Sequence, residues 1–423
     1  MIRATAGSSS LDLPHGVQGV ADANFACAVR GFAALFPHPR FGGGALSVYL
    51  DGEPVVDVWT GTSDRRGRRH WQADTAPMVF SATKGVASTV IHRLADRGLI
   101  DYDAPVSEYW PEFGANGKAA ITVSDVMRHR AGLSHLRGVR KRELLDHRHM
   151  EDRIAAAPVG RHFGKSAYHA LTYGWLLSGL ARSVTGKGMR QLMRLEVAKP
   201  LNTDGVHLGR PPVGSPTHAA RFIGSQMNIP NPLFNALAPA VAGLELSAAF
   251  GSMYVPGVKR LVQRDVPLLD TELPSANGVI TARALARMYG AIANGGMIDG
   301  RRYLSAERVA MLTGRRNLRP DRNLVMPMAF HLGFHGLPIP GVLPGFGHVG
   351  LAGSFGWAIP DEGLAISLVH NRLLTPMVLT DQAGFVSTAT LVRRGAATAR
   401  KRGFQPIVEF GSPYATPVVG MVG

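Results

Sequence analysis

The 423-residue sequence contains a single cysteine, Cys27. An internal disulfide framework, an iron–sulfur cluster and a cysteine-ligated zinc site are therefore excluded. Acidic residues are also scarce: 30 Asp and Glu stand against 46 Lys and Arg, which gives a formal net charge of +16. Such a surface attracts nucleic acid or anionic lipid. The arginine clusters lack interleaved aromatic residues and no nucleic-acid module accompanies them, so we expect no nucleic-acid partner.

Long apolar runs are missing as well. No stretch of about 18 residues is free of charge and proline, and the N-terminus lacks the apolar core of a secretory signal. We therefore expect neither a transmembrane helix nor a signal peptide. The expected location is cytoplasmic or, through the basic surface, peripherally associated with the cell envelope. The hydrophobic content of 45% is typical of a globular protein.

Two β-prone regions lie far apart in the chain. The first predicts a hairpin over residues 45–59, with Asp51-Gly52 at its turn, because both turn residues tolerate positive φ. The second predicts strands over Gly350–Ile359 and Leu364–Val369. The simplest assembly joins both regions in one antiparallel sheet.

Between and around these regions the pattern is mostly helical. Apolar residues at helical spacing predict helices over Phe25–Phe36, Val79–Arg97, Tyr168–Val184, Thr281–Asn294 and Val378–Arg402. Thr122 and Asp125 have the spacing of a capping box at a further helix start. We expect the terminal helices to cover the sheet and a helical lobe to lie beside it, with a site in the crevice between them.

These elements suggest one catalytic domain built from two parts. Residues 1–20 are expected to form a flexible N-terminal segment. Residues 21–65 with 335–423 are expected to form the α/β sheet part, and residues 66–334 a mostly helical part. The helical part includes an apolar insertion over residues 206–270, whose stretch 236–250 is a candidate border for an acyl pocket or a lipid contact.

The sharpest chemical feature is Ser81-Ala-Thr-Lys84, where an extended segment enters a predicted helix. A serine at a helix N-terminus meets unpaired N–H groups and the positive end of the helix dipole, which stabilise an alkoxide or oxyanion. Lys84 lies one turn on, on the same face. A buried lysine loses its proton readily and can then activate a serine hydroxyl. The pair predicts a nucleophile and its base.

The wider pattern makes this pair more specific. The stretch Phe80–Gly85, followed by Asp96–Val106 and Ile121–Leu133, resembles the serine β-lactamase and penicillin-binding-protein superfamily. It is most similar to the class C β-lactamase-like branch that contains family VIII carboxylesterases. The similarity runs from about Gly42 to Asn371. It implies a β-lactamase/transpeptidase-like fold, an α/β plus all-α arrangement.

The resemblance assigns roles to particular residues. It implies that Ser81 is the nucleophile, that Lys84 is its base partner, and that Tyr168 shares the proton transfer as a phenolate or a relay. The K-T-G motif falls at His348-Val349-Gly350, on a strand that faces the substrate. The backbone N–H groups of Ser81 and Leu351 would then form the oxyanion hole, and His169, His348 and Gly350 would contact the substrate.

Two departures from the superfamily pattern bear on the substrate. The third position of the Y-x-N motif is Ala170, and the K-T-G lysine and threonine are replaced by His348 and Val349. Histidine is mostly neutral near pH 7, so the fixed charge that would bind a penicillin carboxylate is absent from this position. We therefore expect a serine esterase or lipase acting on a small-molecule ester, with lipid esters among the candidates. No metal or organic cofactor is required, and the pattern predicts no particular oligomeric state.

Several alternatives stay open. A β-lactamase or a D-alanyl-D-alanine carboxypeptidase would use the same nucleophile on an amide. A metal-dependent hydrolase would use the cluster around His147 and His149, which lies beside acidic residues. A binding module with a decayed site is a non-enzymatic alternative. The G-x-S-x-G elbow of α/β-hydrolases has no match, and the glycine-rich stretch 160–166 is one residue short of a phosphate-binding loop.

Overall fold

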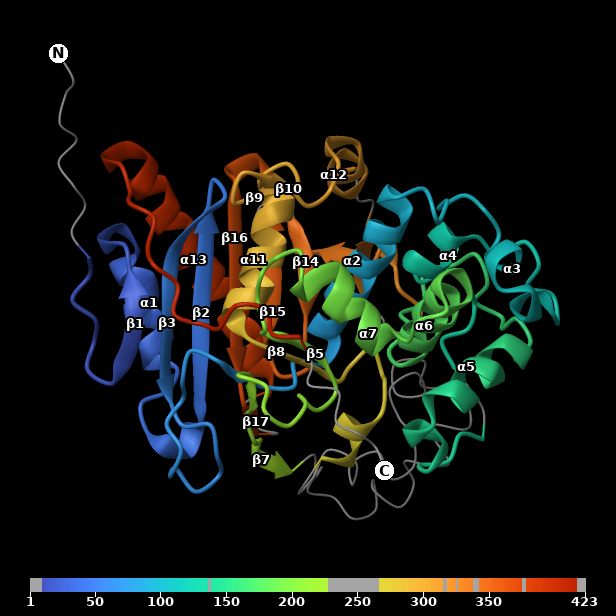
Figure 1. Cartoon of the computed structure of the whole chain (residues 1–423), viewed down its shortest axis with the longest axis horizontal. Helices are drawn as coiled ribbons and strands as arrows, with labels where there is room; N and C mark the ends of the chain where they lie inside the picture. The colour runs from blue at the N-terminus through green and yellow to red at the C-terminus, as the bar shows by residue number, and fades with distance from the viewer. Residues whose placement is uncertain are drawn as a thin grey trace.

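The computed structural model describes residues 10–135, 138–226, 266–314, 318–324, 326–337, 342–374 and 378–416. Figure 1 shows two parts side by side, a large sheet with helices against it and a lobe made mostly of helices. Both the N-terminal and the C-terminal segments of the chain contribute to the sheet part. The apolar stretch 236–250 and most of the predicted insertion lie outside the described residues.

Within the described ranges, nine strands form one antiparallel sheet in the order β1-β3-β2-β16-β15-β14-β13-β12-β11. Their bounds are β1 (Val17–Ala21), β2 (Gly43–Leu50), β3 (Glu53–Gly61), β11 (Arg319–Pro320), β12 (Pro327–His331), β13 (Phe334–Gly336), β14 (Phe346–Val349), β15 (Phe355–Ile359) and β16 (Leu364–His370). The two β regions meet where β2 pairs with β16. The predicted single antiparallel sheet is therefore confirmed.

Local turn chemistry explains the hairpin between β2 and β3. Asp51 and Gly52 adopt φ values of 50° and 84°, the left-handed region that glycine and aspartate tolerate. Between β14 and β15 the structure differs from the prediction. Residues 350–354 form a turn, closed by the N–H of Gly350 donating to the carbonyl of Ser354 at 2.7 Å, and the strand begins only at Phe355. A glycine-rich run favours such a tight turn over a continuous strand.

Alternate residues along a strand point to opposite faces of the sheet. In the central strands both faces are buried, since helices pack on each side. In β16, Ile366 and Leu368 pack with α1 (Ala26–Ala34) and α13 (Val378–Arg402). Ala365 and Val369 face the other core, which includes α11 (Ala282–Ala293). In Figure 1, α1 and α13 lie on one side of the sheet and α11 on the other. The prediction that the terminal helices cover the sheet is confirmed.

The helical lobe surrounds the central helix α2 (Thr83–Asp96). It contains α3 (Val106–Tyr109), α4 (Val123–Met127), α5 (His147–Ala156), α6 (Thr172–Thr185) and α7 (Met189–Met193), which continues as a π turn over Arg194–Ala198, while α12 (Ala306–Thr313) lies nearer the sheet. Two-stranded ladders pair β4 (Thr75–Ala76) with β6 (His218–Ala219), β5 (Val206–Leu208) with β8 (Gly278–Ile280), β7 (Ile223–Gln226) with β17 (Arg372–Leu374) and β9 (Met297–Ile298) with β10 (Arg301–Arg302).

Helix boundaries follow their capping residues. Thr122 and Asp125 form the predicted capping box at the start of α4, and Thr281 caps α11 as expected. The predicted helix start at Tyr168 is wrong, because α6 begins only at Thr172 and Tyr168 lies in the preceding loop. No helix within the described ranges is both long and apolar enough to cross a membrane.

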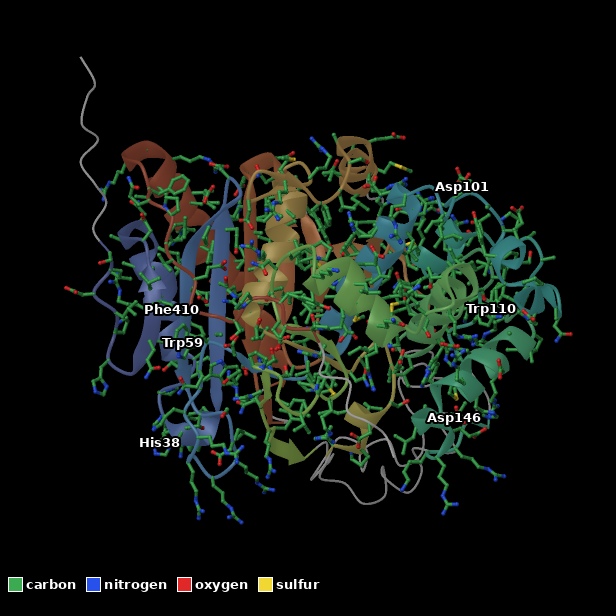
Figure 2. The ribbon with its side chains drawn as sticks, viewed as in Figure 1. His38, Trp59, Asp101, Trp110, Asp146 and Phe410 are labelled. Carbon is green, nitrogen blue, oxygen red and sulfur yellow. The ribbon has the colours of Figure 1, made fainter. Side chains whose placement is uncertain are left out.

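After α13 the chain returns across the molecule as an extended segment over residues 403–416. Its backbone N–H groups are anchored by aspartates: Phe410 donates to Asp57 at 3.1 Å, and Ser412 donates to Asp74 at 2.8 Å. Figure 2 shows Phe410 beside Trp59, and their rings meet edge to face with centroids 5.7 Å apart.

The sheet also includes β11 and β12, which precede residue 335, the predicted start of the second half of the sheet part. The division of the chain into two parts stays a prediction.

Candidate active site

Ser81 lies at the entrance to α2 and is half-buried. Just before it, the N–H of Val79 donates to the carbonyl of Gly278 in β8 at 2.9 Å, which fixes the incoming chain. Phe80 then adopts a φ of 48°, a conformation that is uncommon for a residue other than glycine and that is concentrated at functional sites. A 3-10 turn over Phe80–Ala82 leads directly into α2. The left-handed backbone at Phe80 therefore sets the position of Ser81 at the start of α2.

Lys84 is fully buried one turn after Ser81. Its Nζ lies 3.1 Å from Ser81 Oγ and donates to the carbonyl oxygens of Ala170 at 2.7 Å and Ser275 at 2.9 Å. These contacts are to neutral groups. Burial therefore lowers the pKa of Lys84 well below its usual value, because the ammonium form loses its hydration without gaining a counter-charge.

Tyr168 approaches Ser81 from the helical lobe. Its hydroxyl donates to Ser81 Oγ at 3.0 Å, and Lys84 Nζ lies 4.9 Å from the centre of its ring. The ring stacks on Phe330 of β12, with centroids 5.6 Å apart. Burial raises the pKa of Tyr168 above its usual value, and the negative charge of Asp321 raises it further, while the hydrogen bond to Ser81 lowers it. The structure thus brings the three predicted groups together around one oxygen.

The other wall of the site is the end of β14, which lies beside α2 in Figure 1. Gly350 begins the turn after β14 and comes very close to the segment that carries Ser81. A methyl group in place of its hydrogen would lie 2.3 Å from the carbonyl oxygen of Val79. The next residue, Leu351, is half-buried and packs against the larger core. The predicted oxyanion-hole turn therefore lies directly against the approach to the nucleophile.

His348 is buried on β14, with 2% of its surface exposed. Its ring lies 4.8 Å from that of His335 and 6.4 Å from that of Tyr168, between centroids. Nδ1 contacts the carbonyl of Val349 at 3.2 Å, and within the described part of the chain no group hydrogen-bonds with Nε2. Burial and the neighbouring His335 and Lys84 lower the pKa of His348 well below its usual value. The ring is therefore neutral at neutral pH.

His169 has a different environment from the one expected for a substrate contact. It is fully buried, and both ring nitrogens have partners within the protein. Nε2 accepts the N–H of Leu133 at 3.1 Å, and Nδ1 lies 2.7 Å from the carbonyl oxygen of Ala167, to which it can only donate. Burial lowers the pKa of His169 to about 3. These bonds leave the ring no free nitrogen for a substrate.

Sequence reasoning missed the groups that hold Lys84. Both are backbone carbonyls, those of Ala170 and Ser275, and a carbonyl has no side-chain signature in a sequence. It also missed Phe330, the platform under Tyr168.

The histidines of α5 do not form a metal-binding group with their neighbours. His149 instead contacts Glu143 at 3.0 Å, and among the described residues no group of three His, Cys, Asp or Glu side chains is placed to hold a metal ion.

Comparison with known proteins agrees with this geometry. The beta-lactamase family model matches residues 26–387. The chain is 62% identical over 416 residues to an "Esterase/beta-lactamase LipL" of Mycobacterium tuberculosis, which covers 98% of this chain and 97% of that relative. A crystal structure of a family VIII carboxylesterase matches with a TM-score of 0.74 and 32% identity, over 88% of this chain and 99% of that one.

A penicillin-binding-protein homologue from Caulobacter crescentus matches equally well. Its TM-score is 0.74 at 29% identity, over 90% of this chain and 99% of that chain. The family match spans most of the chain, from the start of α1 into α13. It includes the helix start with Ser81 and Lys84 and, within the described ranges, every strand of the large sheet except β1. Together with the antiparallel sheet and the helical lobe, it establishes that this chain belongs to the beta-lactamase family.

Proposed function

We propose that this protein is a serine hydrolase that cleaves carboxylic esters through an acyl-enzyme on Ser81. The observation that carries the proposal is the fully buried Lys84, whose Nζ lies 3.1 Å from Ser81 Oγ between two backbone carbonyls. The similarity to an esterase/beta-lactamase and to a family VIII carboxylesterase supports the same reaction class.

Lys84 is proposed as the base. In the neutral amine, the two N–H groups donate to the carbonyls of Ala170 and Ser275, so the lone pair faces Ser81 Oγ. As Oγ attacks the ester carbonyl carbon, its proton moves to Lys84 Nζ and the carbonyl oxygen becomes an oxyanion. The lowered pKa of Lys84 supports this role, because a general base must be unprotonated at the working pH.

Tyr168 is proposed as a proton relay. Its raised pKa favours the neutral phenol over the phenolate, and its hydroxyl lies 3.0 Å from Ser81 Oγ. When the tetrahedral intermediate collapses, the alkoxide leaving group takes a proton through Tyr168 from the Lys84 ammonium. Water then attacks the acyl carbon and gives a proton to Lys84. The bond between the acyl carbon and Ser81 Oγ breaks, Oγ takes that proton back from Lys84, and the carboxylic acid leaves.

The oxyanion is proposed to be held by the backbone N–H groups of Ser81 and Leu351. The position of Ser81 at a helix start and the contact between Gly350 and Val79 support this assignment. Donors aimed at the developing charge contribute about 10²–10³-fold each in related acyl transfer. We also propose that His348 and Gly350 border the bound substrate.

The neutral His348 supports esters over penicillins as substrates, because it offers no charge to a carboxylate. The second candidate is a β-lactamase, or a D-alanyl-D-alanine carboxypeptidase that uses the same nucleophile. The LipL relative is named for both activities, which favours a β-lactamase as this second candidate. Peripheral association with the cell envelope stays a prediction. It is supported by four exposed arginines, Arg65, Arg66, Arg68 and Arg69. Co-sedimentation with anionic vesicles tests it.

The test is steady-state hydrolysis of p-nitrophenyl esters from C2 to C16, with a chromogenic cephalosporin in parallel. Ser81→Ala should abolish ester turnover and labelling by a fluorophosphonate. Lys84→Met should lower kcat by about 10²–10⁴-fold, as expected for loss of a general base. Ser387→Ala, an exposed serine on α13, is the matched control and should leave turnover unchanged.

Each outcome separates two readings of the site. Undiminished esterase activity in purified Ser81→Ala would refute the nucleophile assignment. Cephalosporin cleavage much faster than ester cleavage would favour the second candidate. Lack of fluorophosphonate labelling in the wild type would favour a site without catalytic function.

A further inference from the structure

We infer that Asp321 is the positioning residue for Tyr168, and that it acts on the reaction through the tyrosine hydroxyl. The inference rests on the function proposed for Ser81 and Tyr168. Asp321 lies directly after β11, in the loop that leads to β12, and only 2% of its surface is exposed. It is 153 residues away from Tyr168 in the sequence.

The Asp321 carboxylate accepts four hydrogen bonds. Oδ1 accepts the N–H groups of Tyr168 at 3.1 Å, Asn323 at 3.0 Å and Leu324 at 2.9 Å, and Oδ2 accepts the hydroxyl of Ser166 at 2.8 Å. Two of these donors belong to its own loop and two to the segment that carries Tyr168. One carboxylate therefore joins the two loops.

The same two loops are joined by a second pair of bonds. The N–H of Arg322 donates to the carbonyl of Ser166 at 2.9 Å, and Nδ2 of Asn323 donates to the carbonyl of Tyr168 at 2.8 Å. Asn323 is fully buried. The backbone of Tyr168 is thus held on both its N–H and its carbonyl by neighbouring residues of one loop.

The ring of Tyr168 is held by the continuation of that loop. Phe330, on β12, stacks almost parallel to it, with an interplanar angle of 7°. With backbone and ring both fixed, the hydroxyl has little freedom to leave its place 3.0 Å from Ser81 Oγ. Reacting groups need such restraint, since a misplacement of about 1 Å can cost 10²-fold in rate.

Burying a carboxylate costs free energy, because its charge loses hydration. Within the described ranges no Lys or Arg side chain forms an ion pair with Asp321, so the hydrogen bonds alone offset that cost. Its charge also raises the pKa of Tyr168, which keeps the phenol protonated and able to donate to Ser81.

The test is a double-mutant cycle between Asp321→Ala and Tyr168→Phe, read out as kcat and KM for p-nitrophenyl butyrate and as the rate of fluorophosphonate labelling. We expect Asp321→Ala alone to lower kcat by about 10²-fold, with KM changed less than about threefold. In the Tyr168→Phe background, it should lower kcat by less than about threefold more, because the hydroxyl it positions is gone.

Asp321→Asn serves as the conservative variant. Its Oδ1 can accept the same three N–H groups, and its Nδ2 can donate to Ser166 Oγ, so the shape stays while the charge is lost. We expect it to recover most of the kcat lost in Asp321→Ala, and its cycle with Tyr168→Phe replaces the first one where Asp321→Ala does not fold. Asp22→Ala is the matched control, since Asp22 is a buried aspartate that accepts the N–H of Asn24. It should lower the melting temperature without changing kcat.

Two results would overturn different conclusions. If Asp321→Ala lowers kcat equally with and without the Tyr168 hydroxyl, Asp321 is only a structural residue and the inference fails. If Tyr168→Phe itself leaves both rates unchanged, the proposed role of Tyr168 fails first, and the inference falls with it. The single-variant arms of the cycle distinguish the two cases.

Discussion

The buried Asp57 on β3 makes the stability of this protein depend on pH in an unusual direction. Asp57 is 5% exposed, and its Oδ2 accepts the N–H of Phe410 from the returning C-terminal segment. Burial raises the pKa of Asp57 to about 6, and the nearby carboxylate of Glu409 adds to the rise. The hydrogen bond from Phe410 and the charge of Arg283 oppose it, but they are the weaker effects.

The sign follows from linkage. In the unfolded chain an aspartate has a pKa near 3.9, so the folded state binds the Asp57 proton more tightly. The contribution of this group to stability is complete below about pH 4 and is lost as the pH rises through about 6. The folded and unfolded pKa values differ by about 2, and each unit is worth about 1.4 kcal/mol. Ionised Asp57 therefore costs about 3 kcal/mol at pH 7.5.

Asp57→Asn removes that cost and keeps an oxygen for the N–H of Phe410. We expect its advantage in free energy of unfolding over the wild type to grow by about 2 kcal/mol between pH 4.5 and pH 7.5. For a chain of this size that corresponds to roughly 2–4 °C in melting temperature. Thermal denaturation followed by circular dichroism at the two pH values measures it.

Asp57→Ala provides the control. It lacks the hydrogen bond to Phe410 as well as the charge, so its melting temperature should be lower than that of Asp57→Asn at both pH values. The melting-temperature difference between Asp57→Ala and the wild type should change with pH as much as that of Asp57→Asn, because both variants lose the same ionisable group. An offset between wild type and Asp57→Asn that does not change with pH would refute the reasoning.

Two further substitutions test the packing of the site and of the sheet. Gly350→Ala places a methyl group 2.3 Å from the carbonyl oxygen of Val79, so kcat should fall by about 10²-fold in a folded protein. Gly384→Ala on α13 should leave kcat unchanged, because among the described residues outside its own stretch of helix the added methyl group would meet only Leu35, at 4.0 Å. Arg372→Met breaks the buried pair with Asp381, in which Nε donates to Oδ2 at 3.0 Å, and should lower stability by about 3–5 kcal/mol in denaturant titration. Loss of kcat in the Gly384 variant, or an unchanged stability in the Arg372 variant, would contradict these expectations.

Local patterns predicted the parts of the site that are local in the chain. The spacing of Ser81 and Lys84 places both on one helix face whatever the rest of the fold does, and Asp51-Gly52 forms a hairpin turn because of its own backbone preferences. The capping residues Thr122 and Thr281 likewise marked their helix starts. In each case the interaction that decides the structure joins residues within a few positions of one another.

The features in which the structure differs from the sequence-based expectation depend on contacts between distant segments. The loop before α6 stays non-helical while hydrogen bonds from residues 321–323 hold the backbone of Tyr168, and nothing near Tyr168 in the sequence records them. The turn after Gly350 lies against Val79, some 270 residues earlier. His169 was expected to contact the substrate because of its place in a motif, but its Nε2 accepts the N–H of Leu133. Motif membership predicts which segment is near the site and not which way each side chain points.

The distribution of charge around Ser81 ties the mechanism to the substrate. Lys84 and Tyr168 both have pKa values displaced toward their neutral forms, chiefly because they are buried. In the resting site the Ser81 hydroxyl keeps its proton, and its partners Lys84 and Tyr168 are neutral. Charges therefore develop only during the acylation step. Electrostatic stabilisation is then concentrated on the oxyanion, which backbone N–H groups serve best. A fixed cation at position 348 would add a charge to the resting site and raise the cost of protonating Lys84. A neutral His348 avoids this and also offers no attraction for a carboxylate substrate, so the needs of the base and the proposed preference for uncharged esters favour the same residue at this position.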